Sequence, residues 1–228
     1  MPSALVTGGS SGIGLAIAQM LRDEGHGLTV VSRTAEKLER AAAPLEAFTV
    51  TADVRREEDC ERAVAEHVDR HGGLDVLVNS AGVGFAGELD QLDVKRIDLQ
   101  LDVNLRGPIL VTRAALPHLR AARGLVVNVA SIAGTVPVPQ LPVYAATKAA
   151  LISLTNSLNA ALDADGVRAH ALCPGFVDTP MAAYSGLSGD EMIRLEDCAE
   201  VVRMLLRLSP RARIPQVVIE RVGAAGAA

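Results

Sequence analysis

Tyr144 and Lys148 stand four positions apart in a segment that reads Tyr-Ala-Ala-Thr-Lys-Ala-Ala-Leu. This segment is rich in strong helix formers and begins after Pro142, so it predicts a helix with both side chains on one face. A free phenol titrates near pH ~10, but an ammonium group close by favours the phenolate and lowers that pKa by about 1–3 units. The pair therefore predicts a phenol that can donate and accept a proton at neutral pH.

Ser131 is a further candidate for chemistry. It follows the apolar run Leu125–Ala130, which reads as a buried strand, so its hydroxyl lies at the carboxyl end of that strand. Open α/β sheets bind their ligands at these ends. A tyrosine and a lysine with this spacing also occur on ordinary solvent-exposed helices. The interpretation as a catalytic site therefore depends on the surrounding elements.

A glycine-rich turn follows the first apolar run of the chain, Ala4–Val6, and precedes a predicted helix over residues 15–24. Glycines allow positive φ angles and let backbone N–H groups approach a pyrophosphate, which the positive end of the helix attracts. The turn has neither the GxGxxG spacing of the common dinucleotide fingerprint nor the GK[ST] of a phosphate loop. A glycine turn without a ligand is the alternative. The residues predicted to contact a cofactor here are Thr7, Gly8, Ser10, Ser11, Gly12, Ile13 and Gly14.

The second predicted strand, Gly27–Ser32, ends in polar residues. A site for NAD usually carries an acidic residue here, because a carboxylate accepts a hydrogen bond from the ribose 2′-hydroxyl. This sequence instead has Ser32, Arg33 and Thr34. A guanidinium group with two hydroxyls suits a 2′-phosphate, which a carboxylate would repel. We therefore expect NADP(H) to be favoured over NAD(H), although an arginine at the start of a helix can also be merely solvated.

Strand and helix patterns alternate along the chain. Further strands are predicted over residues 48–51, 74–78, 125–130 and 216–220, and a helix over residues 57–71. Such alternation is typical of a parallel sheet. The sequence thus predicts an α/β fold, a doubly wound, Rossmann-like parallel sheet of about seven strands with helices on both faces. The 228 residues suit a single domain over residues 1–228, with a frayed tail over 223–228.

Composition and charge narrow the class of protein. The net charge is −5 and no lysine/arginine cluster stands out, so a nucleic-acid partner is not expected. No apolar run approaches the ~20 residues of a membrane span, and the first residues lead directly into a strand, so we expect a soluble, cytoplasmic protein without a membrane partner. The 3 cysteines are widely spaced, and no metal site is predicted.

Taken in order, these features resemble the short-chain dehydrogenase/reductase family, single-domain type, over residues 5–222. The glycine turn has the family's spacing, and the family's Asn-Asn-Ala-Gly after the fourth strand appears here as Asn-Ser-Ala-Gly, residues 79–82. The family's catalytic spacing matches Ser131, Tyr144 and Lys148. Further matches are Asp53-Val54, Asp102–Leu105 and Cys173–Thr179.

The resemblance implies a role for each catalytic residue. Tyr144 would pass a proton to a carbonyl oxygen during reduction, or take it from an alcohol during oxidation. Lys148 would lower the pKa of the phenol and bind the nicotinamide ribose, and Ser131 would donate a hydrogen bond to the developing alkoxide. Asn104 would hold a water that links Lys148 to solvent, although an asparagine just before Gly107 and a proline also fits a helix kink. The hydride belongs to the nicotinamide.

The resemblance also implies cofactor contacts and an assembly. Asp53 and Val54 would contact the adenine, and the segment Cys173–Thr179 would hold the nicotinamide carboxamide. A homodimer or homotetramer is expected, because relatives pair through the helices around residues 104–119 and 144–162. The cofactor residues implied in this way are Asp53, Val54, Asn79, Ala81, Gly82, Tyr144, Lys148, Pro174, Gly175, Val177 and Thr179.

The expected substrate is a small, fairly apolar carbonyl compound or secondary alcohol. The resemblance places its pocket between the loop before Tyr144 and the segment after Gly175, and neither carries a basic cluster. The second segment is short, which favours an open pocket with broad specificity. The candidate lining residues are Ile132, Val136, Val138, Gln140, Leu141, Met181, Tyr184, Leu187 and Met192.

The leading interpretation is an NADP(H)-dependent oxidoreductase that interconverts a carbonyl and a secondary alcohol. An epimerase or dehydratase is a rival, because extended relatives share the tyrosine–lysine pair, but these need a larger substrate domain. The other alternative is a catalytically silent NADP(H)-binding sensor or regulatory protein of the same fold. Such a sensor could lose the catalytic residues, all of which this sequence carries.

Overall fold

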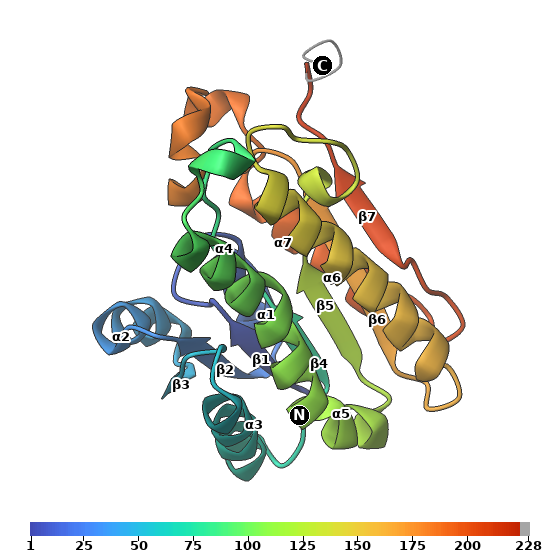
Figure 1. The fold of residues 1–228 in the computed structure, drawn as a ribbon. Coiled ribbons are helices and arrows are strands. Elements are labelled where there is room, and N and C mark those ends of the chain that lie inside the picture. The colour runs from blue at the N-terminus through green and yellow to red at the C-terminus, as the bar shows by residue number, and fades with distance from the viewer. Residues whose placement is uncertain (224–228) are drawn as a thin grey trace.

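The computed structural model describes residues 1–223, and a parallel sheet of seven strands runs through them (Figure 1). The strands are β1 (Ser3–Thr7), β2 (Gly27–Ser32), β3 (Phe48–Thr51), β4 (Val76–Asn79), β5 (Leu125–Val129), β6 (Arg168–Pro174) and β7 (Gln216–Ile219). They take the order β3-β2-β1-β4-β5-β6-β7, and all the pairings are parallel. The strand order reverses between β1 and β4. This confirms the predicted doubly wound, Rossmann-like sheet.

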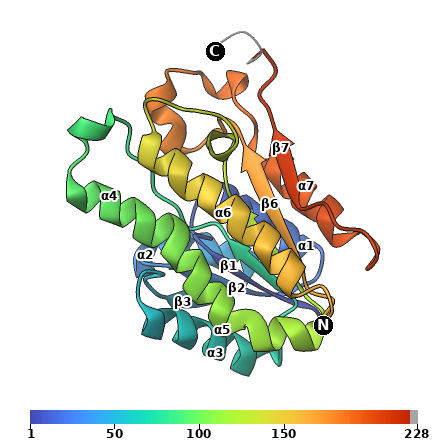
Figure 2. The same ribbon diagram turned by 45° about the vertical axis from the view of Figure 1, so that its right-hand side comes forward.

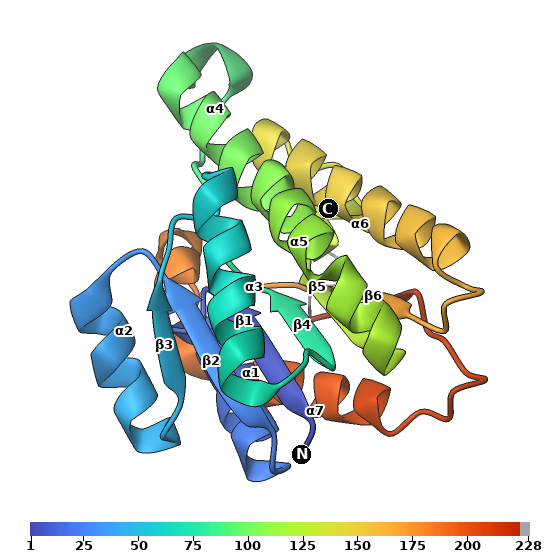
Figure 3. The same cartoon turned by 90° about the horizontal axis from the view of Figure 1, so that it is seen from below.

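Helices cover both faces of the sheet, as predicted. They are α1 (Gly12–Asp23), α2 (Ala35–Ala42), α3 (Glu57–His71), α4 (Val94–Leu101), α5 (Gly107–Ala122), α6 (Pro142–Ala161) and α7 (Leu195–Leu206). α1 and α7 pack together on one face, and α3, α5 and α6 lie on the other (Figure 3). α4 continues into α5 through a short turn, and this rod runs beside α6 (Figure 2).

Strand β1 shows why the central strands are apolar throughout. The side chains of Ala4 and Val6 belong to the apolar cluster beneath α1 and α7, whereas Leu5 belongs to the cluster beneath α3 and α5. All three are completely buried. Successive side chains of a strand point to opposite faces, so a strand with helices on both sides has no solvent-facing position. Burial of this surface stabilises the sheet by roughly 25 cal/mol per Å².

Several predicted boundaries are confirmed, and others shift by a few residues. β2, β3 and α3 have the predicted bounds. β5 and β7 end one residue earlier than predicted, and β4 begins two residues later and ends one residue later. α1 begins at Gly12 rather than Leu15, because Ser11 has extended backbone angles and the chain turns helical directly after it. Part of the glycine turn is therefore the first turn of the helix.

Two further boundaries differ near the expected site. α6 begins at Pro142 rather than Tyr144, since the fixed φ of proline suits the first turn of a helix. Cys173 and Pro174, expected to follow the sixth strand, are the last residues of β6. The predicted frayed tail lies outside the described residues, apart from Gly223.

A buried polar cluster lies at the amino end of the sheet. His67 of α3 is completely buried, and its ring nitrogens lie 2.7 Å from Thr29 Oγ1 and 3.3 Å from Ser3 Oγ. The His71 ring is 4.8 Å away between centroids. Burial, reinforced by the nearby charge of His71, lowers the pKa of His67 to about 4. The folded protein therefore holds this ring neutral between two hydroxyl groups.

We expect this histidine to make the protein less stable in mild acid. Its folded-state pKa of about 4 lies below the unfolded value of 6.5, so the unfolded chain binds more protons and stability falls as pH drops from about 6.5 towards 4. The free energy of unfolding should fall by about 2 kcal/mol between about pH 7 and about pH 5. His67→Gln should flatten this dependence in urea unfolding. Equal slopes in both proteins would contradict the assignment.

Candidate active site

A cavity of about 510 Å³ opens at the carboxyl ends of the strands. Its walls come from the segments that follow β1, β2, β3, β4, β5 and β6. It therefore spans the place where the strand order reverses between β1 and β4, which is where open α/β sheets bind ligands. The sequence predicted this position from the motifs at the strand ends.

The glycine turn forms one wall of the cavity and requires its glycines. Gly8 and Gly12 have φ angles of +68° and +55°, which glycine adopts without strain. A Cβ at Gly8 would lie 2.7 Å from the backbone nitrogen of Ala81, and a Cβ at Gly14 would lie 2.5 Å from the carbonyl oxygen of Gly8. The turn after β1 and the turn after β4 thus approach each other more closely than side chains would allow.

The residues of this turn divide between the cavity wall and the layer behind it. Thr7 and Gly14 are not among the lining residues. The Thr7 hydroxyl accepts hydrogen bonds from the backbone N–H groups of Ser80 and Ala81, at 3.2 and 3.4 Å, and so holds the two turns together. The lining residues are Gly8, Ser10, Ser11, Gly12 and Ile13.

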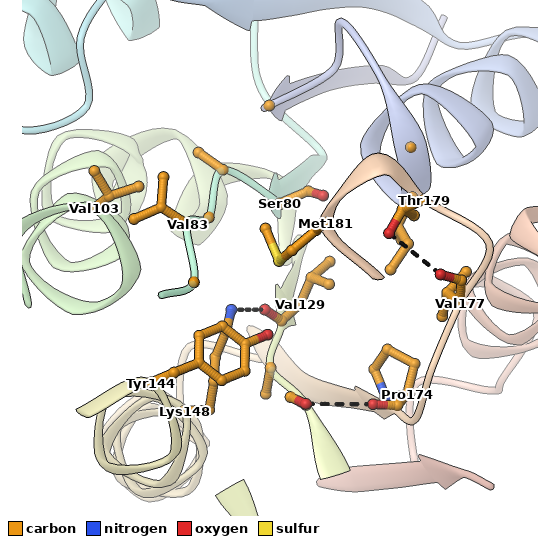
Figure 4. Close-up of a pocket in the computed structure, with 18 of the residues that line it drawn as sticks. Ser80, Val83, Val103, Val129, Tyr144, Lys148, Pro174, Val177, Thr179 and Met181 are labelled. Atoms are coloured by element: carbon orange, nitrogen blue, oxygen red, sulfur yellow. Dashed lines mark hydrogen bonds between the residues drawn. The ribbon is translucent and has the colours of Figure 1, made fainter. Parts of the chain in front are cut away.

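Tyr144, Lys148 and Ser131 all line the same cavity. Tyr144 and Lys148 rise side by side from α6, and Lys148 Nζ lies 5.5 Å from the centroid of the Tyr144 ring (Figure 4). Ser131 follows β5, and its hydroxyl lies 3.4 Å from the Pro174 carbonyl oxygen, to which it donates. The Ser131 oxygen also accepts a hydrogen bond from the backbone N–H of Ala133 at 3.2 Å. The structure therefore brings together the three side chains that the sequence singled out.

The ammonium group of Lys148 is buried without a carboxylate partner. It donates a 2.7 Å hydrogen bond to the carbonyl oxygen of Val129, and none of the ion pairs between described residues includes it. Burial lowers its pKa to about 8, opposed by the neighbouring Cys173. Burial raises the pKa of that thiol to about 11. Ionisable groups with strongly shifted pKa values in a cleft are typical of functional sites.

Asn104 lies in a π-helical turn, Asp102–Arg106, which joins α4 to α5. Such turns within α-helices occur often at functional sites. The buried Asn104 amide donates to the Val83 carbonyl oxygen at 2.8 Å and to Thr147 Oγ1 at 3.2 Å, and its oxygen accepts from the Val83 N–H at 2.8 Å. Asn104 therefore ties the loop after β4 to α6. The water expected between Asn104 and Lys148 stays a prediction.

The far end of the cavity carries the residues expected to select the cofactor. Ser32 and Arg33 line it, and the Ser10 hydroxyl donates to Ser32 Oγ at 3.0 Å. Thr34 is not among the lining residues. Arg33 is exposed at the end of β2.

Asp53 does not line the cavity, whereas Val54 does. Arg55, which the sequence reasoning did not single out, holds the Asp53 carboxylate with Nε and Nη2 at 2.5–3.0 Å. This pairing holds the pKa of Asp53 below its usual value, and Arg33 adds to the effect. Asp53 and Arg55 are only two residues apart. Whether their side chains pair depends on the geometry of the turn between them, which the sequence does not show.

Asn79 points into the interior rather than into the cavity. Its amide donates to Asn128 Oδ1 at 2.9 Å and to Thr112 Oγ1 at 3.1 Å, and the Asn128 amide donates to Thr155 Oγ1 at 2.9 Å. All four residues are buried. This chain of hydrogen bonds links β4 and β5 to α5 and α6 directly beneath the site. In the sequence, Asn128 within the otherwise apolar β5 is the feature that could have indicated this network.

Most of the other residues expected to contact the cofactor or the substrate line the cavity, and some do not. The cofactor residues Ala81, Gly82, Pro174, Gly175, Val177 and Thr179 line the cavity, as do the substrate-side residues Ile132, Val138, Leu141 and Met181. Val136, Gln140, Leu187 and Met192 are not among its lining residues, and the structure does not describe the side chain of Tyr184. The lining residues that the sequence did not indicate include Val83, Gly84, Ala133 and Ala182.

Residues 1–223 carry neither a membrane-spanning helix nor a cluster of metal ligands. Within this range no helix is both long and apolar enough to cross a bilayer. The same range contains no group of three histidine, cysteine, aspartate or glutamate side chains arranged to hold a metal ion.

Comparison with known proteins identifies the family. The family model described as short chain dehydrogenase matches residues 2–188. An uncharacterized oxidoreductase of Staphylococcus epidermidis is 34% identical over 222 residues, 96% of each protein. The solved structure of an alcohol dehydrogenase from the archaeon Thermococcus sibiricus, complexed with 5-hydroxy-NADP, has a TM-score of 0.91 at 30% identity and 97% coverage of each chain. A 3-ketoacyl-(acyl-carrier-protein) reductase from Brucella melitensis, complexed with NADH, has a TM-score of 0.88 at 28% identity and 96% coverage of each chain.

The chain belongs to the short-chain dehydrogenase/reductase family. It is a nicotinamide-dependent oxidoreductase of that family.

Because the charge of Lys148 is buried, the effect of Lys148→Met on the free energy of unfolding should depend on pH. The lysine is protonated below about pH 8 in the fold and below 10.5 in the unfolded chain, so its burial costs most below about pH 8 and nothing above 10.5. The stability of Lys148→Met relative to the wild type should therefore decrease by about 2 kcal/mol between about pH 7 and about pH 9.5. Urea unfolding at the two pH values measures it.

The exposed Lys95 on α4 provides the matched control. Lys95→Met removes the same charge without a buried environment, so its stability relative to the wild type should not change over this range. A pH-independent difference for Lys148→Met would show that the ammonium group is not desolvated in the fold.

Proposed function

We propose that this protein is an NADP(H)-dependent oxidoreductase that interconverts a carbonyl and a secondary alcohol, with Tyr144 as the general acid and base. The observation that carries the proposal is the arrangement in one cavity of the Tyr144–Lys148 pair, Ser131 and the glycine turn. The alternative of a silent nucleotide sensor does not account for a buried, unpaired ammonium group beside a phenol.

The glycine turn fits the pyrophosphate of a dinucleotide. The first turn of α1 carries no acidic residue, so the positive end of the helix dipole faces the cavity unopposed. Glycine at positions 8 and 12 allows the positive φ angles with which the backbone of the turn can approach phosphate oxygens. The bound nicotinamide supplies the hydride. The proposed cofactor site is completed by the lining residues Ala81, Gly82, Pro174, Gly175, Val177 and Thr179. Behind this lining, Thr7, Gly14 and Asn79 support the turns that form it.

Arg33 favours NADP(H). This exposed arginine follows β2 and lines the cavity together with the hydrogen-bonded Ser10 and Ser32, and its guanidinium group can bind a 2′-phosphate in a bidentate way. Of the related structures, the archaeal alcohol dehydrogenase holds an NADP derivative and the Brucella reductase holds NADH. Because these two structures hold different cofactors, the proposed preference for NADP(H) rests on the side chains of this chain alone.

Proton transfer is the part that this chain's own residues perform. Tyr144 gives its proton to the carbonyl oxygen during reduction, and Ser131 turns its hydroxyl from the Pro174 carbonyl to the same oxygen. The positive charge of Lys148 stabilises the phenolate that remains. Donors placed where negative charge develops are worth a few kcal/mol of barrier.

The substrate is a fairly apolar ketone or secondary alcohol. The charged side chains among the lining residues are Arg33 at the cofactor end and Lys148 beside the phenol. Val138, Leu141 and Phe176 supply apolar surface around the reacting groups. The whole chain acts as one dinucleotide-binding and catalytic unit, and we retain a homodimer or homotetramer as part of the proposal.

Tyr144→Phe should abolish turnover while it leaves the affinity for NADPH within about twofold, because only the proton donor is lost. NADPH oxidation with a panel of ketones measures turnover, and the fluorescence of bound NADPH measures affinity. Retained activity in Tyr144→Phe, or NADPH binding by the wild type without oxidation across a broad panel, would overturn the proposal.

Arg33→Ser should raise the KM for NADPH about 10–100-fold and leave the KM for NADH nearly unchanged, since a charge-assisted contact to phosphate contributes about 1.5–3 kcal/mol. Arg40→Ser is the matched control, because Arg40 is an exposed arginine on the neighbouring α2 that does not line the cavity. An unchanged ratio of the two KM values in Arg33→Ser would show that another residue selects the cofactor.

A further inference from the structure

A carboxylate stands near the place proposed for the 2′-phosphate of the cofactor. Where β2 and β3 end side by side, the Ala52 N–H donates to the Ser32 carbonyl oxygen at 3.1 Å. Arg33 and Asp53 therefore follow the ends of neighbouring strands, which lie about 4.8 Å apart in a sheet. The pKa of Asp53 is lowered chiefly by Arg55 and further by Arg33, so the charges of Arg33 and Asp53 interact. An unpaired carboxylate at this position would repel a phosphate bound by Arg33.

Arg55 neutralises this carboxylate. Its Nε lies 3.0 and 2.9 Å from the two Asp53 oxygens, and its Nη2 lies 2.5 Å from Oδ2. The Arg55 and Asp53 side chains are 39% and 18% exposed, so solvent screens the pair only in part. Asp59, in the first turn of α3, is also paired, with Arg62 at 2.9 Å. Both carboxylates are thus matched by a guanidinium group.

Arg55 acts from outside the cavity. It is not among the lining residues, although Ala52 and Val54 on either side of Asp53 are. Its backbone is held without its own side chain, because its N–H donates to Asp53 Oδ1 at 3.1 Å and the Arg106 guanidinium group donates to its carbonyl oxygen. Loss of the Arg55 guanidinium group should therefore leave the turn in place and uncover the charge of Asp53.

We propose that Arg55 determines the preference for NADP(H) indirectly, by neutralising the Asp53 carboxylate that would otherwise repel the 2′-phosphate at Arg33. The inference rests on the proposed function, because it takes the 2′-phosphate to lie at Arg33. NADPH and NADH differ only in this phosphate. The ratio of their dissociation constants therefore isolates the effect, and any contact that both dinucleotides make, such as one to the adenine, cancels.

Arg55→Gln should raise the ratio of the Kd for NADPH to the Kd for NADH by about 3–10-fold, the size expected of one partly screened charge within a Debye length of the phosphate. Addition of Asp53→Asn should return the ratio to within about twofold of the wild type. The second change removes the uncovered charge and keeps an oxygen that accepts the backbone N–H of residue 55. The fluorescence of bound NADPH and NADH measures both constants without turnover.

Ionic strength separates an electrostatic role from a structural one. The effect of Arg55→Gln should shrink between about 0.1 M and about 1 M NaCl, because the Debye length falls from about 10 Å to about 3 Å. Arg56→Gln is the matched control, since it removes the same charge from the next residue. Arg56 and its partner Glu58 are both 64% exposed and screened by solvent, so the ratio should change by less than about twofold.

Each other outcome contradicts a stated part of the account. An unchanged ratio in Arg55→Gln, with both dinucleotides bound, would overturn this inference and leave the proposed function standing. Equal weakening of both dinucleotides would mean that Arg55 only shapes the turn. A loss of NADPH binding that Asp53→Asn does not restore would mean that Arg55 contacts the phosphate itself, and either result overturns the inference. A wild type that binds neither dinucleotide, or a ratio unchanged in Arg33→Ser, would instead overturn the proposed cofactor site on which the inference rests.

Discussion

Lys148 keeps a positive charge in the interior of the protein beside an aromatic hydroxyl, and the rest of the site depends on this placement. Lowering its pKa from 10.5 to about 8 corresponds to roughly 3 kcal/mol of desolvation that the fold has to offset. The carbonyl oxygen of Val129, at 2.7 Å, is the polar group that holds it. A side chain kept at such a cost is typical of a catalytic group, since proteins seldom bury an unpaired lysine for stability.

The architecture around this charge is built to keep it in place. Val129 ends β5, so the register of the central sheet fixes the carbonyl that Lys148 binds. Beneath it, the hydrogen bonds from Asn79 to Asn128 and on to Thr155 lock β4 and β5 against α6, the helix that carries the pair. A chain of buried hydrogen bonds in a low-dielectric core rigidifies the groups around it. Tyr144 and Lys148 therefore stand on a helix that packs against the sheet rather than on a loop.

The fold could be predicted well from the sequence because its strands are buried on both faces and end in recognisable turns. The position of Ser131, Tyr144 and the glycine turn around one cavity could also be predicted, because parallel strands end at one edge of a sheet and bring their final residues together. Most of the failures have a common physical cause, which is contact between segments far apart in the chain. The inward turn of Asn79 and the hydrogen bonds of Asn104 depend on such contacts. The pairing of Arg55 with Asp53 is local and depends instead on the geometry of the turn between them.

The central claim is that the ammonium group makes its neighbouring phenol more acidic. The sequence has only 2 tyrosines and no tryptophan, so the variant Tyr184→Phe leaves Tyr144 as the sole phenol whose ionisation appears in the near-ultraviolet spectrum. Titration of this variant with NADP⁺ bound, with and without the additional Lys148→Met change, tests the claim most directly. The account predicts that the phenolate band appears at a distinctly lower pH when Lys148 is present. Appearance at the same pH in both proteins would contradict it.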